Sequence, residues 1–267
     1  MDDRELPFTE HLEELRQRLK RSIIAVLVAF AFTYCLREEI FELLQMPMHG
    51  ALAYYKQYNP GSSFDTVMHF KNPIEPFFTY LKLAIYAAVF LSIPYIFYQI
   101  WKFIAPGLYR HEKKATAPFI VSSTIMFVLG ALFCHQIALP FGYYALLSYA
   151  GQNVVPMLMM QEYVSVTLML LLGFGIVFEM PVLLIFLCRI GLLTPQQLAR
   201  FRKYALILLF IVAAILTPPD VFSQVLLAIP MYVLYELSIL GARILGKPIP
   251  REQPQAGEPK GEPSPAG

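Results

Sequence analysis

Two carboxylates in this sequence occupy positions where a negative charge is unfavourable or unexpected. Glu179 lies in the apolar run 163–188, and a charge near the centre of a membrane-spanning helix costs about 2.5–3.5 kcal/mol. Glu112 is the one acid among the four bases between residues 102 and 114. Such acids suit proton binding or recognition of a cationic ligand. The structural alternatives are a bond to a free backbone group for Glu179 and local neutralisation for Glu112.

A third carboxylate, Glu14, belongs to a predicted helix near the N-terminus. Leu12, Leu15 and Leu19 recur at helical spacing and form one apolar face, which suits a helix lying on a membrane surface. Glu14 precedes Arg18 by four residues. An ion pair at that spacing, worth about 0.3–0.5 kcal/mol, is the alternative to a role in ligand binding.

Familiar catalytic motifs are missing from the sequence. It contains no GxxxxGK[ST] phosphate loop and no GxSxG nucleophile motif. His111-Glu112 begins like the zinc motif HExxH, but Ala115 stands where the second His belongs. We therefore expect no catalytic residue, no cofactor and no metal site, and we expect the protein not to be an enzyme. A net charge of +2 also argues against a nucleic-acid-binding protein.

The elements that must position these acids are apolar. Of the 267 residues 57% are hydrophobic and 15% charged, and residues 115–161 contain no Lys, Arg, Asp or Glu. Soluble domains carry about 25% charged residues, so lipid must surround much of this chain. A bilayer requires about 20 apolar residues per helix. Six runs qualify or nearly qualify: 22–36, 77–100, 117–139, 163–188, 204–216 and 221–240.

We therefore predict an all-α membrane protein of six transmembrane helices, preceded by a cytoplasmic amphipathic helix. The last two spans are short, and a re-entrant hairpin is the alternative for them. Seventeen of the 21 basic residues fall on one side if both termini are cytoplasmic, as the positive-inside rule favours. Residues 37–76 and 140–162 are then outer loops. Residues 1–246 are predicted to form one membrane domain and 247–267 a disordered Pro/Gly-rich tail.

Glycine and proline residues mark breaks and close contacts in these spans. Pro106-Gly107 is expected to end a helix, and Pro181 to kink the fourth span just after Glu179. Gly173 and Gly175 would allow another helix to approach closely, or the span to bend further. Asp220 follows Pro218-Pro219 and could cap the sixth helix.

Four stretches together carry a family resemblance. They are His11-Leu12-x-Glu14-Leu15-Arg16, Phe103 to Glu112 (FIAPGLYRHE), Phe174-Gly-x-x-Phe178-Glu179-x-Pro181, and Thr217 to Gln224 (TPPDVFSQ). In this order and spacing, the chain resembles TatC, the polytopic core subunit of the twin-arginine protein translocase. The resemblance covers nearly all of the apolar part of the chain.

The resemblance implies a concave six-span receptor in the bacterial cytoplasmic (inner) membrane, driven by the proton-motive force. It would bind twin-arginine signal peptides of folded cargo proteins at its cytoplasmic face. It would work with the single-span subunits TatA and TatB, in a receptor complex of several copies. By motif position Glu14 and Glu112 would contact the Arg pair, and Leu12, Leu15, Arg16 and Phe103 would complete that surface.

The same resemblance places Glu179 in an intramembrane groove, and Thr217 and Gln224 where partner helices dock. Pro106, Pro181 and Asp220 are residues of its motifs. The other function considered is a proton-coupled small-solute transporter that uses Glu179 as carrier. The absence of an internal repeat and the position of the other acids at the membrane edge argue against it.

Overall fold

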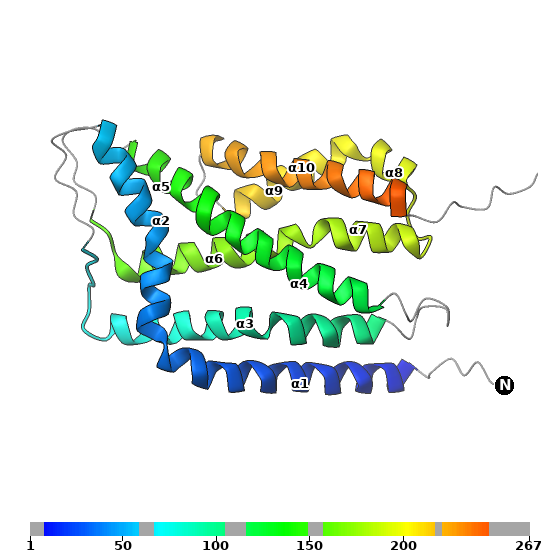
Figure 1. Ribbon diagram of the computed structural model, residues 1–267, viewed down its shortest axis with the longest axis horizontal. Coiled ribbons are helices and arrows are strands. Elements are labelled where there is room, and N and C mark those ends of the chain that lie inside the picture. The colour runs from blue at the N-terminus through cyan, green and yellow to red at the C-terminus, as the bar shows by residue number, and fades with distance from the viewer. Residues whose placement is uncertain (1–7, 59–66, 105–115, 149–156, 217–220, 246–267) are drawn as a thin grey trace, which may run out of the picture.

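The computed structural model describes residues 8–58, 67–104, 116–148, 157–216 and 221–245. The secondary structure there is helical, apart from one isolated β-bridge. In Figure 1 most helices run along the long axis of the molecule. One end of the bundle holds both described termini, and we call it the termini end. The other holds α2, and we call it the α2 end. The helices are α1 (Phe8–Cys35), α2 (Arg37–Tyr58), α3 (Glu75–Ile104), α4 (Thr116–Phe133), the π-helix η3 (Cys134–Ala138), α5 (Leu139–Ser148), α6 (Met160–Phe178), α7 (Met180–Arg189), α8 (Pro195–Arg200), α9 (Arg202–Leu216) and α10 (Val221–Leu245).

The prediction of an all-α membrane protein is confirmed. Four segments of the described chain are long and apolar enough to cross a bilayer, and the bent pair α1–α2 would make a fifth. Helix α9, which contains the predicted fifth span, is short, as expected, with 15 residues. At 1.5 Å per residue it spans about 22 Å. The last helix is longer than predicted, with 25 residues, because it continues beyond residue 240 to Leu245.

The first helix corrects one prediction. We expected an amphipathic surface helix separate from the first span, but α1 is one continuous helix of 28 residues. The reason is local: residues 8–35 contain neither Gly nor Pro, and their Leu, Glu, Arg and Lys are strong helix formers. The charged half and the apolar half of α1 therefore form a single rod.

The segment after α1 corrects a second prediction. We expected residues 37–76 to form a loop, but residues 37–58 are helix α2, which bends away from α1 by 83°. Glu38 and Glu39 lie in its first turn, where acids interact favourably with the helix dipole. Its buried face packs into the main core at helical spacing. That face consists of Leu44, Met48, Ala51, Leu52 and Tyr55.

Pro47 lies inside α2 and explains how this helix attaches to the rest of the molecule. Proline has no N–H and its ring disturbs the preceding turn, so nearby carbonyls lose their helical partners. Two side chains from other helices bind carbonyls in this turn. His135 Nε2 lies 2.9 Å from the Leu43 oxygen, and the Tyr163 hydroxyl donates to the Leu44 oxygen at 2.6 Å.

A clasp joins the segments that precede α3 and α6 at the α2 end. His69 and Met159 form a parallel β-bridge, with backbone N–H···O distances of 2.8 and 2.9 Å. The buried Glu75 carboxylate accepts hydrogen bonds from the backbone N–H of Lys71 (2.9 Å) and of Gln161 (3.3 Å). Lys71 also pairs with Glu162 at 2.6 Å, which raises the pKa of the lysine.

The second predicted outer loop, 140–162, is partly helical. After α4 the chain continues through η3 and α5 to Ser148, and this stretch is 32 residues long from Ala117. Pro140 lies in the first turn of α5, where its missing N–H is tolerated. It therefore does not end the helix. The three cysteines are free, so Cys35 and Cys134 are not paired.

The fourth predicted span breaks at Glu179, as Pro181 indicated. α6 ends at Phe178, and α7 begins at Met180 with Pro181 in its first turn. The predicted close approaches are also present. A Cβ at Gly175 would lie 2.6 Å from the Phe127 ring, and one at Gly173 would lie 2.6 Å from Leu216. The two glycines thus bring α4 and α9 against α6.

Gly130 makes the least adjustable of these contacts, because a Cβ there would lie 2.7 Å from a backbone atom, the Phe174 oxygen. Backbone cannot turn away as a side chain can, so α4 would have to shift. We expect Gly130→Ala to lower the free energy of unfolding by about 1–2 kcal/mol. The matched control is Gly142→Ala in α5, where no atom lies within 4 Å. It should raise stability by about 0.5–1 kcal/mol. Denaturant unfolding in mixed micelles measures both, and equal effects would contradict the packing argument.

Candidate functional site

The site lies at the termini end, where α1 and α3 pack antiparallel. Two contacts define their register: the Thr33 hydroxyl donates to the Ala84 oxygen at 2.8 Å, and Arg18 contacts Gln99. The same register, followed four residues further towards the termini end, places Glu14 of α1 level with Phe103 of α3. The structure thus brings together two of the predicted site residues that lie far apart in the sequence.

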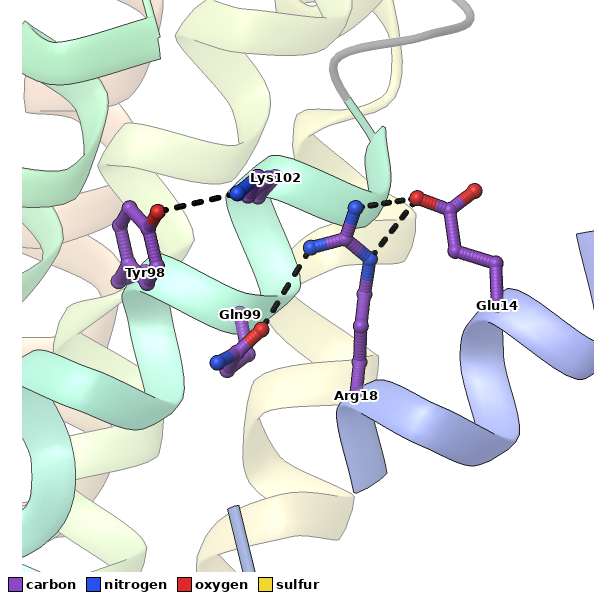
Figure 2. A network of polar contacts seen from close by, with 5 residues as sticks. All are labelled: Glu14, Arg18, Tyr98, Gln99 and Lys102. Atoms are coloured by element: carbon purple, nitrogen blue, oxygen red, sulfur yellow. Dashed lines mark hydrogen bonds and ion pairs between the residues drawn. The ribbon is translucent and has the colours of Figure 1, made fainter. Parts of the chain in front are cut away.

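The centre of the site is the Arg18 guanidinium, which lies between Glu14 and Gln99 (Figure 2). Its Nε donates to Glu14 Oε1 at 3.1 Å, its Nη2 bonds the same oxygen, and its Nη1 donates to Gln99 Oε1 at 3.5 Å. The Arg18 side chain is 11% exposed and that of Glu14 28%. Glu14 is therefore a half-buried carboxylate that already binds a guanidinium, and the predicted i,i+4 pair is confirmed.

A basic and aromatic rim adjoins this pair on the last turns of α3. Lys102 donates to the Tyr98 hydroxyl at 3.2 Å, and its ammonium lies 5.3 Å from the centre of the same ring. Phe103 is half-buried. Three more predicted residues lie exposed on α1: Leu12 (49% exposed), Leu15 (44%) and Arg16, which pairs with Glu13 at 3.4 Å. The apolar face predicted for this helix is thus available to lipid or to a ligand.

An aromatic cluster supports this rim from behind. Trp101 is 6% exposed, stacks on Phe119 with ring centroids 5.0 Å apart, and meets Phe186 edge-on at 4.8 Å. Its indole N–H donates to the hydroxyl of Ser123, which is buried, at 3.0 Å. The cluster ties α3 to α4 and α7. It thereby fixes the turn of α3 that carries Gln99 and Phe103.

Glu179 lies apart from this site, at the break between α6 and α7. Its Oε1 atom is buried and has no hydrogen-bond partner within the described structure. Its polar neighbours are Ser123 and the backbone at Phe127, both on α4. The predicted bond from this carboxyl to a free backbone group therefore does not account for Oε1.

The remaining predicted residues divide into two groups. Gln224 is half-buried, and its amide donates to the Phe210 oxygen at 3.0 Å, so it links α10 to α9. Glu112, Pro106, Thr217 and Asp220, together with the predicted tail 247–267, lie outside the described residues. Among the residues described, no group of three or more His, Cys, Asp or Glu side chains could hold a metal ion.

Sequence reasoning missed Gln99 and the bond between Trp101 and Ser123. One sign was available: Gln99 is a polar amide in the otherwise apolar and aromatic run 93–101 of α3. Such a residue needs a partner when it is buried. Which helix supplies the partner depends on the α1–α3 register, which periodicity alone does not give.

Comparisons with known proteins agree with this picture of a multi-pass helical membrane protein. A family model described as Sec-independent protein translocase protein (TatC) matches residues 10–230. The chain is 40% identical over 257 residues to the TatC protein of Desulforapulum autotrophicum, covering 96% of this chain and 92% of the relative. It is 39% identical to that of Escherichia coli K12, with 92% of both chains covered.

A crystal structure described as the twin-arginine translocase receptor TatC has the same fold. It superposes with a TM-score of 0.74 at 38% identity, over 88% of this chain and 99% of that one. These similarities define the class: a polytopic membrane component of a protein-translocation system. The chain belongs to the TatC family. The relatives are named as components of a protein translocase, which indicates transport of proteins rather than catalysis.

Proposed function

We propose that this chain is the receptor of a twin-arginine translocase and binds signal peptides at the termini end of the bundle. The observation that carries the proposal is the half-buried Glu14 carboxylate with a guanidinium bound to it. A guanidinium presents five N–H donors in a planar fork, which suits carboxylate acceptors. Glu112 would meet the second arginine of the peptide, and Leu12, Leu15, Arg16 and Phe103 would contact its flanks.

The proposal includes the surroundings of the receptor. The termini end is cytoplasmic, since the basic residues of α1, α7 and α8 gather there, and the membrane is the bacterial inner membrane. TatA and TatB dock near Thr217 and Gln224, and Glu179 lines the groove used by them or by the peptide. The proton-motive force drives transport, and several copies form the receptor. Residues 1–246 make up the membrane domain, and 247–267 remain outside it.

Photo-crosslinking of a signal peptide tests the receptor assignment. We expect a peptide with an Arg-Arg pair to crosslink to the purified protein, and one with Lys-Lys to crosslink far less. Glu14→Gln keeps the shape of the side chain but removes its charge. It should weaken binding of the Arg-Arg peptide about tenfold, as expected for loss of a charge-assisted hydrogen bond. Glu112→Ala should do the same.

The matched control is Glu13→Gln, the same change one residue earlier, at a side chain that is 52% exposed. It should leave the crosslink within about twofold of wild type, because exposed charges are screened by solvent. Equal crosslinking of the Arg-Arg and Lys-Lys peptides, or an unchanged crosslink in Glu14→Gln, would show that the receptor assignment is wrong.

A further inference from the structure

Glu14, the carboxylate that the proposed function assigns to the peptide arginine, already binds Arg18. Arg18 donates to Glu14 through both Nε and Nη2, and both bonds end on the same oxygen, Oε1. The third donor, Nη1, turns to the amide oxygen of Gln99 on α3. Arg18 belongs to the same chain, so its local concentration at Glu14 is high before any peptide arrives.

The two acceptors of Arg18 differ in strength. Glu14 carries a charge and Gln99 does not, so the guanidinium forms an ion pair with Glu14 but only a charge-assisted hydrogen bond to the neutral amide of Gln99. Arg18 is 9% exposed and Gln99 3%. A cation so little exposed cannot simply lose its partner, because an unpaired buried charge costs several kcal/mol. Gln99 is thus the acceptor to which the guanidinium can turn if Glu14 is taken by another cation.

We infer that Arg18 is a resident competitor for the peptide-binding carboxylate. With no peptide bound, it holds Glu14. When a peptide arginine binds Glu14, Arg18 moves toward Gln99, which keeps its charge hydrogen-bonded. The inference rests on the proposed function, since it assumes that Glu14 contacts the peptide. It adds that a side chain of the same chain occupies the site when no peptide is bound. The affinity for the peptide is therefore lower than the carboxylate alone would give.

A purely structural role for Arg18 predicts the opposite sign. If Arg18 only orients Glu14, its removal leaves the carboxylate less well placed and peptide binding weakens. If Arg18 competes, its removal takes one competing cation away from the carboxylate and binding strengthens. Gln99 distinguishes the two roles further. If Arg18 is displaced by the peptide, Gln99 stabilises the displaced guanidinium and so supports peptide binding, whereas a purely structural Arg18 gives Gln99 no such effect.

The test measures binding of a synthetic signal peptide with an Arg-Arg pair to the full chain in lipid nanodiscs, by fluorescence anisotropy. We expect Arg18→Gln to tighten binding about three- to tenfold, since a part-exposed ion pair no longer has to be broken. We expect Gln99→Leu to weaken binding about threefold. In the double variant the Gln99 effect should vanish, because the residue it serves is gone.

The charge-matched control is Arg21→Gln, which makes the same replacement at an exposed position of α1. It should leave binding within about twofold of wild type. Weaker binding in Arg18→Gln, with the thermal stability of the wild type, would overturn the inference. So would an effect of Gln99→Leu that persists in the double variant. If Arg18→Gln does not fold, Gln99→Leu alone decides. Unchanged or tighter peptide binding in Gln99→Leu would then refute the proposed movement of Arg18 from Glu14 to Gln99.

The failures of the two proposals are distinguishable. Unchanged peptide binding in Glu14→Gln removes the proposed function and the inference with it. Lost binding in Glu14→Gln, together with weaker binding in Arg18→Gln, keeps the receptor site and rejects only the competing role of Arg18.

Discussion

Replacing Trp101 by alanine should destabilise the protein by about 3–5 kcal/mol, the usual cost of deleting a large aromatic side chain from a packed core. Trp101 connects three helices, since it stacks on Phe119 of α4 and meets Phe186 of α7. Its removal would leave a cavity and would take away the N–H donor that the buried Ser123 hydroxyl accepts. The loss should appear as a lower midpoint of denaturant unfolding in mixed micelles.

Two variants separate packing from hydrogen bonding. Trp101→Phe keeps an aromatic ring in the cluster but loses the indole N–H, so we expect a smaller destabilisation of about 1–2 kcal/mol. Phe78→Ala removes an aromatic ring that is 57% exposed on the same helix and should change stability by about 0.5 kcal/mol. If Trp101→Ala resembled Phe78→Ala, the cluster would not hold α3, α4 and α7 together.

The second large effect should have the opposite sign. We expect Glu179→Leu to raise the free energy of unfolding by about 1–3 kcal/mol, because the replacement removes a buried carboxyl oxygen without a partner in the described structure. The same variant should lose protein export if Glu179 serves the proposed groove. Unfolding in mixed micelles and an export assay in cells measure the two effects separately.

Two controls apply to Glu179→Leu: a more conservative substitution at the same position and the same substitution at an exposed position. Glu179→Gln keeps a polar group in the apolar surroundings, so its stability should stay close to wild type, and it should still bind the signal peptide. Glu42→Leu makes the acid-to-leucine change at an exposed position of α2 and should be nearly neutral. A loss of stability in Glu179→Leu would mean that the carboxyl supports the fold, and would refute this prediction.

The sequence allowed prediction of most of the fold because lipid imposes strict rules on length and composition. The spans in α3, α4, α6–α7 and α10 follow from apolar runs, and the break at Glu179 follows from Pro181. Helix α2 was not predicted because Pro47, followed by Pro60, Gly61 and Pro73, indicated a long connection. In the structure, side chains from other helices bind the carbonyls near Pro47, and such long-range partners are invisible to local patterns.

The candidate site was predictable only where it depends on local sequence spacing. The pairing of Glu14 with Arg18 follows from helical spacing alone, and the structure contains it. The contact between Arg18 and Gln99 depends on how two helices that are distant in sequence are aligned. Nothing in the periodicity of α1 or α3 fixes that alignment. It is set by contacts such as that of Thr33 with the Ala84 carbonyl.

The clasp at the α2 end has a consequence for biogenesis. The packing of α1 against α3 needs only the first 104 residues, so these two helices can associate while the rest of the chain is being synthesised. The bridge between His69 and Met159 joins segments that are far apart in the chain, and contacts between distant segments form slowly. Its closure must wait until α4, η3 and α5 have left the ribosome. The clasp is therefore a late step of assembly, and a chain arrested before residue 159 would expose an unpaired backbone segment to quality-control proteases.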